Sequence, residues 1–84
     1  MASLARAWTA EYGGRGVRFN TVAPGPVYTR PEGRDLFDAL GRTTALKRAA
    51  EPTEIAELIL FLLSDHNTYL VGETVTISGG TFIA

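Results

Sequence analysis

The sequence contains no cysteine, one lysine and one histidine among its 84 residues. The lack of cysteine excludes a disulfide framework and a thiolate metal site, and a single histidine is too little for an imidazole-rich one. We therefore predict no metal site. The longest large apolar run, 58–63, is far shorter than the roughly 20 residues that span a bilayer. The first residues carry Arg6 and Glu11 and lack the apolar centre of a signal peptide. We expect a soluble, cytoplasmic protein.

The sequence also lacks a charge excess of either sign. It has 8 basic and 9 acidic residues, a formal net charge of −1, and the basic residues are scattered. Such a chain has no long-range field that attracts nucleic acid or anionic lipid, so we expect neither partner. A fold of 84 residues buries only about 60% of its unfolded surface and is marginal alone.

The apolar pattern predicts a helix, a strand, a long connection, a second helix and a second strand. The predicted ranges are 1–14 for the first helix, 16–25 for the strand and its Pro-Gly turn, 26–50 for the connection, 51–65 for the second helix and 73–78 for the second strand. The apolar stripe of the first helix is already present at Met1, so this helix is expected to begin upstream. Gly13 or Gly14 should end it in a left-handed conformation.

The second predicted helix, 51–65, has Pro52 as its expected first residue and carries glutamates in its first turn. Nearly every one of its faces is apolar, so we expect it to be buried on most sides. One helix between two strands is the crossover that permits parallel pairing. Two strands are fewer than the roughly five or six of an average sheet. The fold class is therefore α/β, with two parallel strands that are incomplete without further strands or a partner chain.

The most informative stretch, 20–29, lies at the carboxyl end of the first predicted strand, where α/β sheets bind ligands. Pro24 should stop the strand, and Gly25 allows a flat ring or a phosphate to approach the backbone. The Thr29 hydroxyl can bond to a phosphate or an amide. The alternative is that Pro24 and Gly25 only turn the chain. Asn20 is expected to be a buried amide bonded to neighbouring backbone.

Further stretches extend this pattern over the whole chain. They are 10–13, 15–18, 20–25, 29, 48–55, 58–65 and 72–80. In this order and spacing they resemble the late section of the short-chain dehydrogenase/reductase family, in particular the 3-oxoacyl-acyl-carrier-protein reductases. The resemblance implies a partial Rossmann-like unit. Ser78 departs from the family, which often has an acidic residue before the last two glycines.

The resemblance also implies roles. Pro24, Gly25 and Val27 would line the nicotinamide pocket of NAD or NADP, with Val27 offering backbone groups to the carboxamide. Thr29 would reach the carboxamide or the pyrophosphate. The connection 26–50 aligns with the family's substrate lid. In that lid Tyr28, Leu36, Phe37 and Leu40 would cover a substrate, or equally serve as a hydrophobic anchor for a loop.

The catalytic residues of the family have no counterpart here. No Gly-x-Gly-x-x-Gly spacing exists, and the only lysine, Lys47, follows Thr43 by four residues instead of a tyrosine. The implied parent reaction is hydride transfer between NAD(P) and a carbonyl or alcohol carbon, but we assign no catalytic residue and expect the isolated chain to be inactive. The alternative function is a non-catalytic module that binds a second copy or a full-length relative. A third hypothesis is that the amino-terminal part of the protein is missing from this chain.

Overall fold

A computed structural model describes residues 2–81 of the chain. The elements in order are α1 (Ala2–Tyr12), the 3-10 turn η1 (Gly13–Arg15), β1 (Thr21–Pro24), α2 (Arg34–Gly41), α3 (Pro52–Leu63) and β2 (Thr74–Ile77). Met1, part of the predicted first helix, lies outside the described residues. The α/β class and the order of the predicted helices and strands are confirmed, and α2 is a further helix within the predicted connection 26–50.

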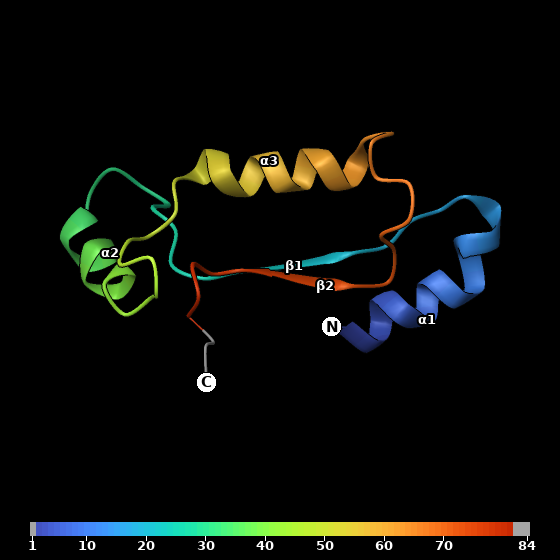
Figure 1. Ribbon diagram of the computed structural model, residues 1–84, viewed down its shortest axis with the longest axis horizontal. Coiled ribbons are helices and arrows are strands. Elements are labelled where there is room, and N and C mark those ends of the chain that lie inside the picture. Colours follow the sequence, from blue (N-terminus) through green and yellow to red (C-terminus); the bar gives the residue numbers. More distant parts are fainter. Residues whose placement is uncertain (1, 82–84) are drawn as a thin grey trace.

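The two strands pair in parallel, as predicted (Figure 1). The register runs from Thr21 beside Thr74 to Pro24 beside Ile77. The amide of Gly25 donates to the Ile77 carbonyl at 3.0 Å, so the ladder continues one bond past Pro24. Pro24 nevertheless ends β1, and its missing N–H lies between two residues that donate to β2, so no bond of this ladder is lost.

β1 is shorter than the predicted range 16–25. The residues just before it lie beside the turn at Gly72 and not beside a regular strand. Gly72 has a left-handed backbone, φ 72°, and its amide donates to the carbonyl of Phe19. The side chain of Asn20 accepts from the Glu73 amide at 3.1 Å and donates to the Leu70 carbonyl at 2.8 Å. The prediction that backbone groups satisfy this amide is confirmed. β2 likewise covers 74–77 instead of 73–78.

α1 packs on the segment before β1 through aromatic rings. Trp8 and Tyr12 lie with ring centroids 5.3 and 6.1 Å from that of Phe19. The prediction that Gly13 or Gly14 takes the left-handed conformation is wrong. The chain continues as the η1 turn, and the left-handed residue is the one that follows it, Gly16, with φ 80°.

α3 is shorter than the predicted range 51–65. Glu51 is its N-cap, and the carboxylate of Glu54 accepts the Glu51 amide in a capping box. The helix ends at Leu63 because Ser64 has an extended backbone. The guanidinium of Arg18 donates to carbonyl oxygens at this end, including that of Ser64 at 3.1 Å, so a charged side chain satisfies groups that helix ends leave unpaired.

The expectation that α3 is buried on most sides is wrong for the described chain. Leu62 is 6% exposed, but Leu60 and Leu63 are 66% and 73% exposed. Figure 1 shows α3 along one face of the strand pair and α1 on the other side. Two strands cover only one side of a helix, which leaves its other sides bare. No helix within residues 2–81 is long and apolar enough to cross a membrane.

Candidate functional site

The turn after β1 lies tightly against the end of β2. A Cβ atom on Gly25 would stand 2.8 Å from the Cα and 2.9 Å from the Cβ of Ser78, closer than real Cβ atoms come. Packing against Ser78 therefore requires glycine at this position. The sequence suggested that Gly25 allows a ligand to approach the backbone, and this role remains a prediction. The contact with Ser78 would require glycine here even without a ligand.

Within residues 2–81, the residues on either side of Val27 form backbone hydrogen bonds with Ala50, whereas Val27 itself does not. The Tyr28 amide donates to the Ala50 carbonyl at 3.0 Å, and the Ala50 amide donates to the Pro26 carbonyl at 2.9 Å. This parallel bridge turns the N–H and C=O of Val27 away from Ala50. Neither group has a hydrogen-bond partner among residues 2–81. Val27 thus presents a donor and an acceptor side by side, which is what an amide ligand pairs with.

An open hollow lies beside these groups, between the turn and the start of α3. It has a volume of about 440 Å³. Its lining is mostly apolar and consists of Pro24, Val27, Thr29, Pro52, Ile55, Ala56 and Ile59. Three of the four residues predicted to bind cofactor therefore meet at one hollow, and Gly25 adjoins it in the turn. One wall of the hollow is formed by α3, through Pro52, Ile55 and Ile59. The sequence pattern alone did not predict that α3 lies beside the turn.

The predicted lid, 26–50, contains the short helix α2. Phe37 faces inward, with its ring edge-on to that of Tyr28 at 6.0 Å and 77°. Leu36 and Leu40, four residues apart, are 56% and 46% exposed. The sequence left two roles open for these side chains, covering a substrate or anchoring the loop. Phe37 fits the role of an anchor, whereas Leu36 and Leu40 form an exposed apolar face that is available to cover a substrate. Their role toward a substrate remains a prediction.

The return half of the lid is among the best-packed parts of the described chain. Thr44 and Ala49 are each 1% exposed. The Thr44 hydroxyl donates to the Gly41 carbonyl at 2.9 Å, and the Leu46 amide donates to the Gly79 carbonyl at 3.0 Å. Sequence reasoning missed this small core, because a threonine in a polar loop carries no signal of burial.

The pKa values of Tyr28 and Glu54 are both shifted by hydrogen-bonded neighbours. The hydrogen bond to Asp38, and then burial, raise the pKa of the Tyr28 phenol. The Arg48 guanidinium, followed by the bond from the Glu51 amide, lowers the pKa of Glu54 to about 2. Arg48 and Glu54 form a two-pronged ion pair, 2.7 and 3.0 Å long, that joins the end of the lid to α3.

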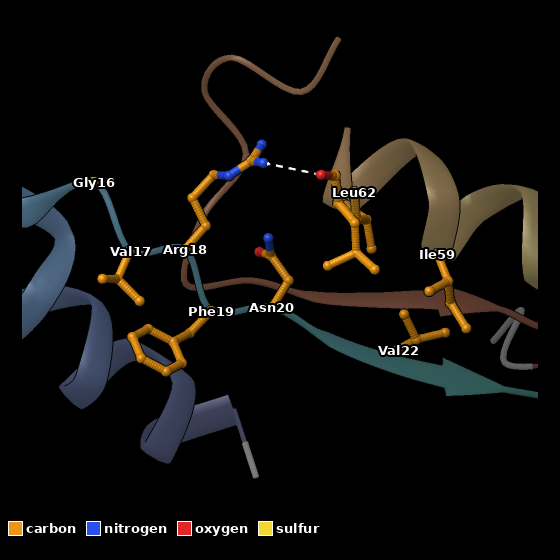
Figure 2. A pocket seen from close by; sticks show the side chains of 9 residues that line it. Gly16, Val17, Arg18, Phe19, Asn20, Val22, Ile59 and Leu62 are labelled. Atoms are coloured by element: carbon orange, nitrogen blue, oxygen red, sulfur yellow. Dashed lines mark hydrogen bonds between the residues drawn. The ribbon is translucent and has the colours of Figure 1, made fainter. Parts of the chain in front are cut away.

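A second hollow lies at the other end of β1 (Figure 2). Its volume is about 550 Å³, and it is lined by Gly16, Val17, Arg18, Phe19, Asn20, Val22, Ile59, Leu62 and Leu63. Figure 2 shows the Arg18 side chain reaching across it to the end of α3. Ligands of α/β sheets bind beyond the carboxyl ends of the strands. This hollow lies at the amino end of β1, so we do not take it as the functional site.

A parallel strand pair joined by a crossover helix, with a Pro-Gly turn and a lid at its carboxyl end, defines part of a Rossmann-type α/β protein. The sequence pattern of the family described as "Enoyl-(Acyl carrier protein) reductase" matches residues 1–81. The chain belongs to the short-chain dehydrogenase/reductase family.

Individual relatives agree with this assignment. The chain is 42% identical to a galactitol 2-dehydrogenase of Cereibacter sphaeroides, over 92% of this chain and 32% of the relative. It is 39% identical to a 3-oxoacyl-[acyl-carrier-protein] reductase of Thermotoga maritima, over 95% of this chain and 34% of the relative. A crystal structure of a short chain dehydrogenase from Bacillus anthracis superposes with a TM-score of 0.83 at 31% identity, over 99% of this chain and 34% of that one. The chain thus spans about a third of the length of these relatives.

Proposed function

We propose that this chain supplies the nicotinamide-side turn and the substrate lid of an NAD(P)-dependent oxidoreductase. The reaction would be hydride transfer to or from a carbonyl or alcohol carbon. The observation that supports this most directly is the free donor and acceptor of Val27 beside an apolar hollow. A nicotinamide ring has an apolar face and carries one carboxamide, so the shape and the polarity of this site both fit it.

The residues of the chain divide the binding work in this proposal. Val27 would bond to the carboxamide through its N–H and C=O. The exposed hydroxyl of Thr29, which has no hydrogen-bond partner within residues 2–81, would donate to the carboxamide or the pyrophosphate. Pro24 and Ile55 would cover the ring and exclude water. The bound cofactor would supply or accept the hydride.

The proton of the reaction would be handled outside this chain. The family's Tyr-x-x-x-Lys pair is absent here, and the only lysine lies in the lid. The relatives carry the names of a dehydrogenase and a reductase, which supports a redox reaction. The isolated chain is therefore expected to give no oxidation of NADH or NADPH with a panel of ketones.

A chimera tests the proposal. The chain replaces the matching third of the Thermotoga maritima reductase, and NAD(P)H oxidation is followed by absorbance. We expect turnover, and we expect Thr29→Val to raise the KM for the cofactor by roughly five- to tenfold, the value of one hydrogen bond. Thr68→Val, at an exposed position in the loop that follows α3, is the matched control. A folded chimera with no turnover, or a Thr29→Val variant with unchanged cofactor KM, would refute the proposal.

A second candidate function is a non-catalytic module that binds a second copy or a full-length relative. Exposed apolar side chains of α1 and α3 favour it, with Trp8 43%, Leu60 66% and Leu63 73% exposed. The two functions are compatible, because part of an oxidoreductase can persist by association. The cytoplasmic location expected from the sequence stays a prediction.

A further inference from the structure

Tyr28 lies between Val27 and Thr29, which are proposed to bind the cofactor, and its side chain packs against the lid helix α2. Its side chain is 9% exposed. The phenol donates to the carboxylate of Asp38, Phe37 lies edge-on to the ring, and the guanidinium carbon of Arg34 stands 3.8 Å from the ring centroid. All three neighbours lie within the first five residues of α2, so one side chain of the turn contacts the first part of that helix.

The backbone of Tyr28 is fixed independently of its side chain. Its amide donates to the Ala50 carbonyl at 3.0 Å, in the bridge that leaves Val27 free. The turn therefore keeps its shape whatever the side chain does. The phenol, in contrast, is the only hydrogen-bond donor from the turn to α2 within residues 2–81.

A second, weaker link ties α2 to the start of α3. Arg34 forms an ion pair with Glu51 at 3.3 Å, with both side chains 52% exposed. An exposed pair of this kind contributes little. The C-terminal end of α2 is held separately, because the buried Gly41 packs on the backbone of Arg48 and Ala49. The direct contact between the turn and the first part of α2 is made by the Tyr28 ring and its bond to Asp38.

We propose that Tyr28 is a positioning residue that couples the cofactor turn to α2 and so sets where the exposed face of Leu36 and Leu40 stands over a substrate. The effect on a substrate rests on the proposed function, whereas the coupling between Tyr28 and α2 is a property of the chain alone. In this arrangement the lid is a preformed cover whose helix moves with the turn.

The charges around Tyr28 keep its hydrogen in place. Asp38 and Glu51 raise the pKa of the phenol and Arg34 opposes them, with the bond to Asp38 as the largest cause. The phenol thus remains a donor throughout the neutral range. Ionisation at alkaline pH would remove the donor and place a negative charge beside the Asp38 carboxylate, which would release α2.

Hydrogen exchange of the α2 amides in the 84-residue chain, without ligand, tests the coupling. Tyr28→Phe keeps the ring and removes the donor, whereas Asp38→Asn weakens the same bond from the less buried side. We expect each to speed exchange across Arg34–Gly41 by about tenfold, the value of one bond to a charged group. Tyr69→Phe, at a side chain 92% exposed, is the matched control and should change nothing.

Two further readouts separate coupling from general loosening of the fold. The double variant Tyr28→Phe/Asp38→Asn should exchange no faster than either single one, because one bond is removed. In an NMR titration, the Asp38→Asn single variant, which keeps Tyr28, should show a lower titration midpoint for the Tyr28 ring carbon than the unsubstituted chain does. Unchanged α2 exchange in Tyr28→Phe, or additive effects in the double variant, would overturn the coupling.

The chimera tests the consequence. Tyr28→Phe should raise the KM for the carbonyl substrate about tenfold, by loss of the same bond, and leave the KM for the cofactor within about twofold. Fast α2 exchange combined with an unchanged substrate KM would overturn the positioning role. Absence of turnover in the unsubstituted chimera would refute the proposed function instead, and the exchange experiment would still decide the coupling.

Discussion

At the scale of single residues, the turn shows that one residue type can be required for two different reasons. The family pattern suggests that Gly25 makes room for a ligand, yet in the structure its missing side chain makes room for Ser78 of the neighbouring chain segment. The second requirement holds even when nothing is bound. A stability measurement on the chain without ligand can therefore detect it.

We predict that Gly25→Ala destabilises the chain by about 1–3 kcal/mol, the usual cost of forcing an extra carbon into a packed site. Its Cβ would lie 2.8 Å from backbone, which cannot move without shifting β2. Urea unfolding with an unchanged m-value measures the effect. The matched control is Gly14→Ala, where nothing lies within 4 Å of the added carbon. Equal midpoints for the two variants would contradict the prediction.

At the scale of elements, the start of α3 depends on one carboxylate with two jobs. Glu54 accepts the Glu51 amide at 2.9 Å and also both prongs of Arg48. The first bond caps the helix, and the second fixes the end of the lid to it. Because both partners favour the charged form, the folded pKa of Glu54 falls to about 2.

This shift makes a pH prediction. A carboxyl whose folded pKa lies below its unfolded value of 4.5 stabilises the fold fully above 4.5, and this contribution is lost as the pH falls toward about 2. Urea midpoints of the chain and of Glu54→Gln should therefore differ at pH 6 and converge by pH 2. Glu57→Gln, exposed on the same helix, is the control. A gap between the chain and Glu54→Gln that stays constant over this range would rule the prediction out.

At the scale of the whole molecule, the chain is elongated for its length. Its radius of gyration is 15.1 Å, whereas a compact domain of 84 residues has about 12 Å. Its extents are 46 × 27 × 18 Å. The two-stranded sheet and the bare sides of α3 explain this shape, because the surfaces that would normally meet a larger sheet have no partner among residues 2–81.

We predict that the chain self-associates at micromolar concentration, because burial of the α3 surface removes large apolar side chains from water. Sedimentation velocity measures it. Leu60→Glu and Leu63→Glu should each shift the distribution toward monomer, whereas Thr53→Glu adds the same charge at an exposed polar position of α3 and should not. A monomeric chain at these concentrations would contradict this prediction and, for the second candidate function, the binding of a second copy.

The element order and the parallel pairing could be predicted from the sequence, because apolar periodicity and the Pro-Gly turn are local signals. The family was indicated by the resemblance of several stretches along the whole chain. The burial of α3 could not, since periodicity shows which faces are apolar but not whether anything covers them. The small core around Thr44 and the left-handed Gly16 were also missed. Both depend on how the chain closes on itself, which no short window of residues records.

The sequence by itself determined what kinds of surface this protein has: an apolar crossover helix, two short β-forming segments and a turn whose proline and glycine end one of them. Only the tertiary structure decided which groups face one another. It left the Val27 backbone without a hydrogen-bond partner within residues 2–81 by pairing both neighbours with Ala50, and it brought the Tyr28 phenol to Asp38 across ten residues. The physical reason is that local conformation follows from neighbouring residues, whereas a hydrogen bond requires two groups that the whole path of the chain must bring within reach.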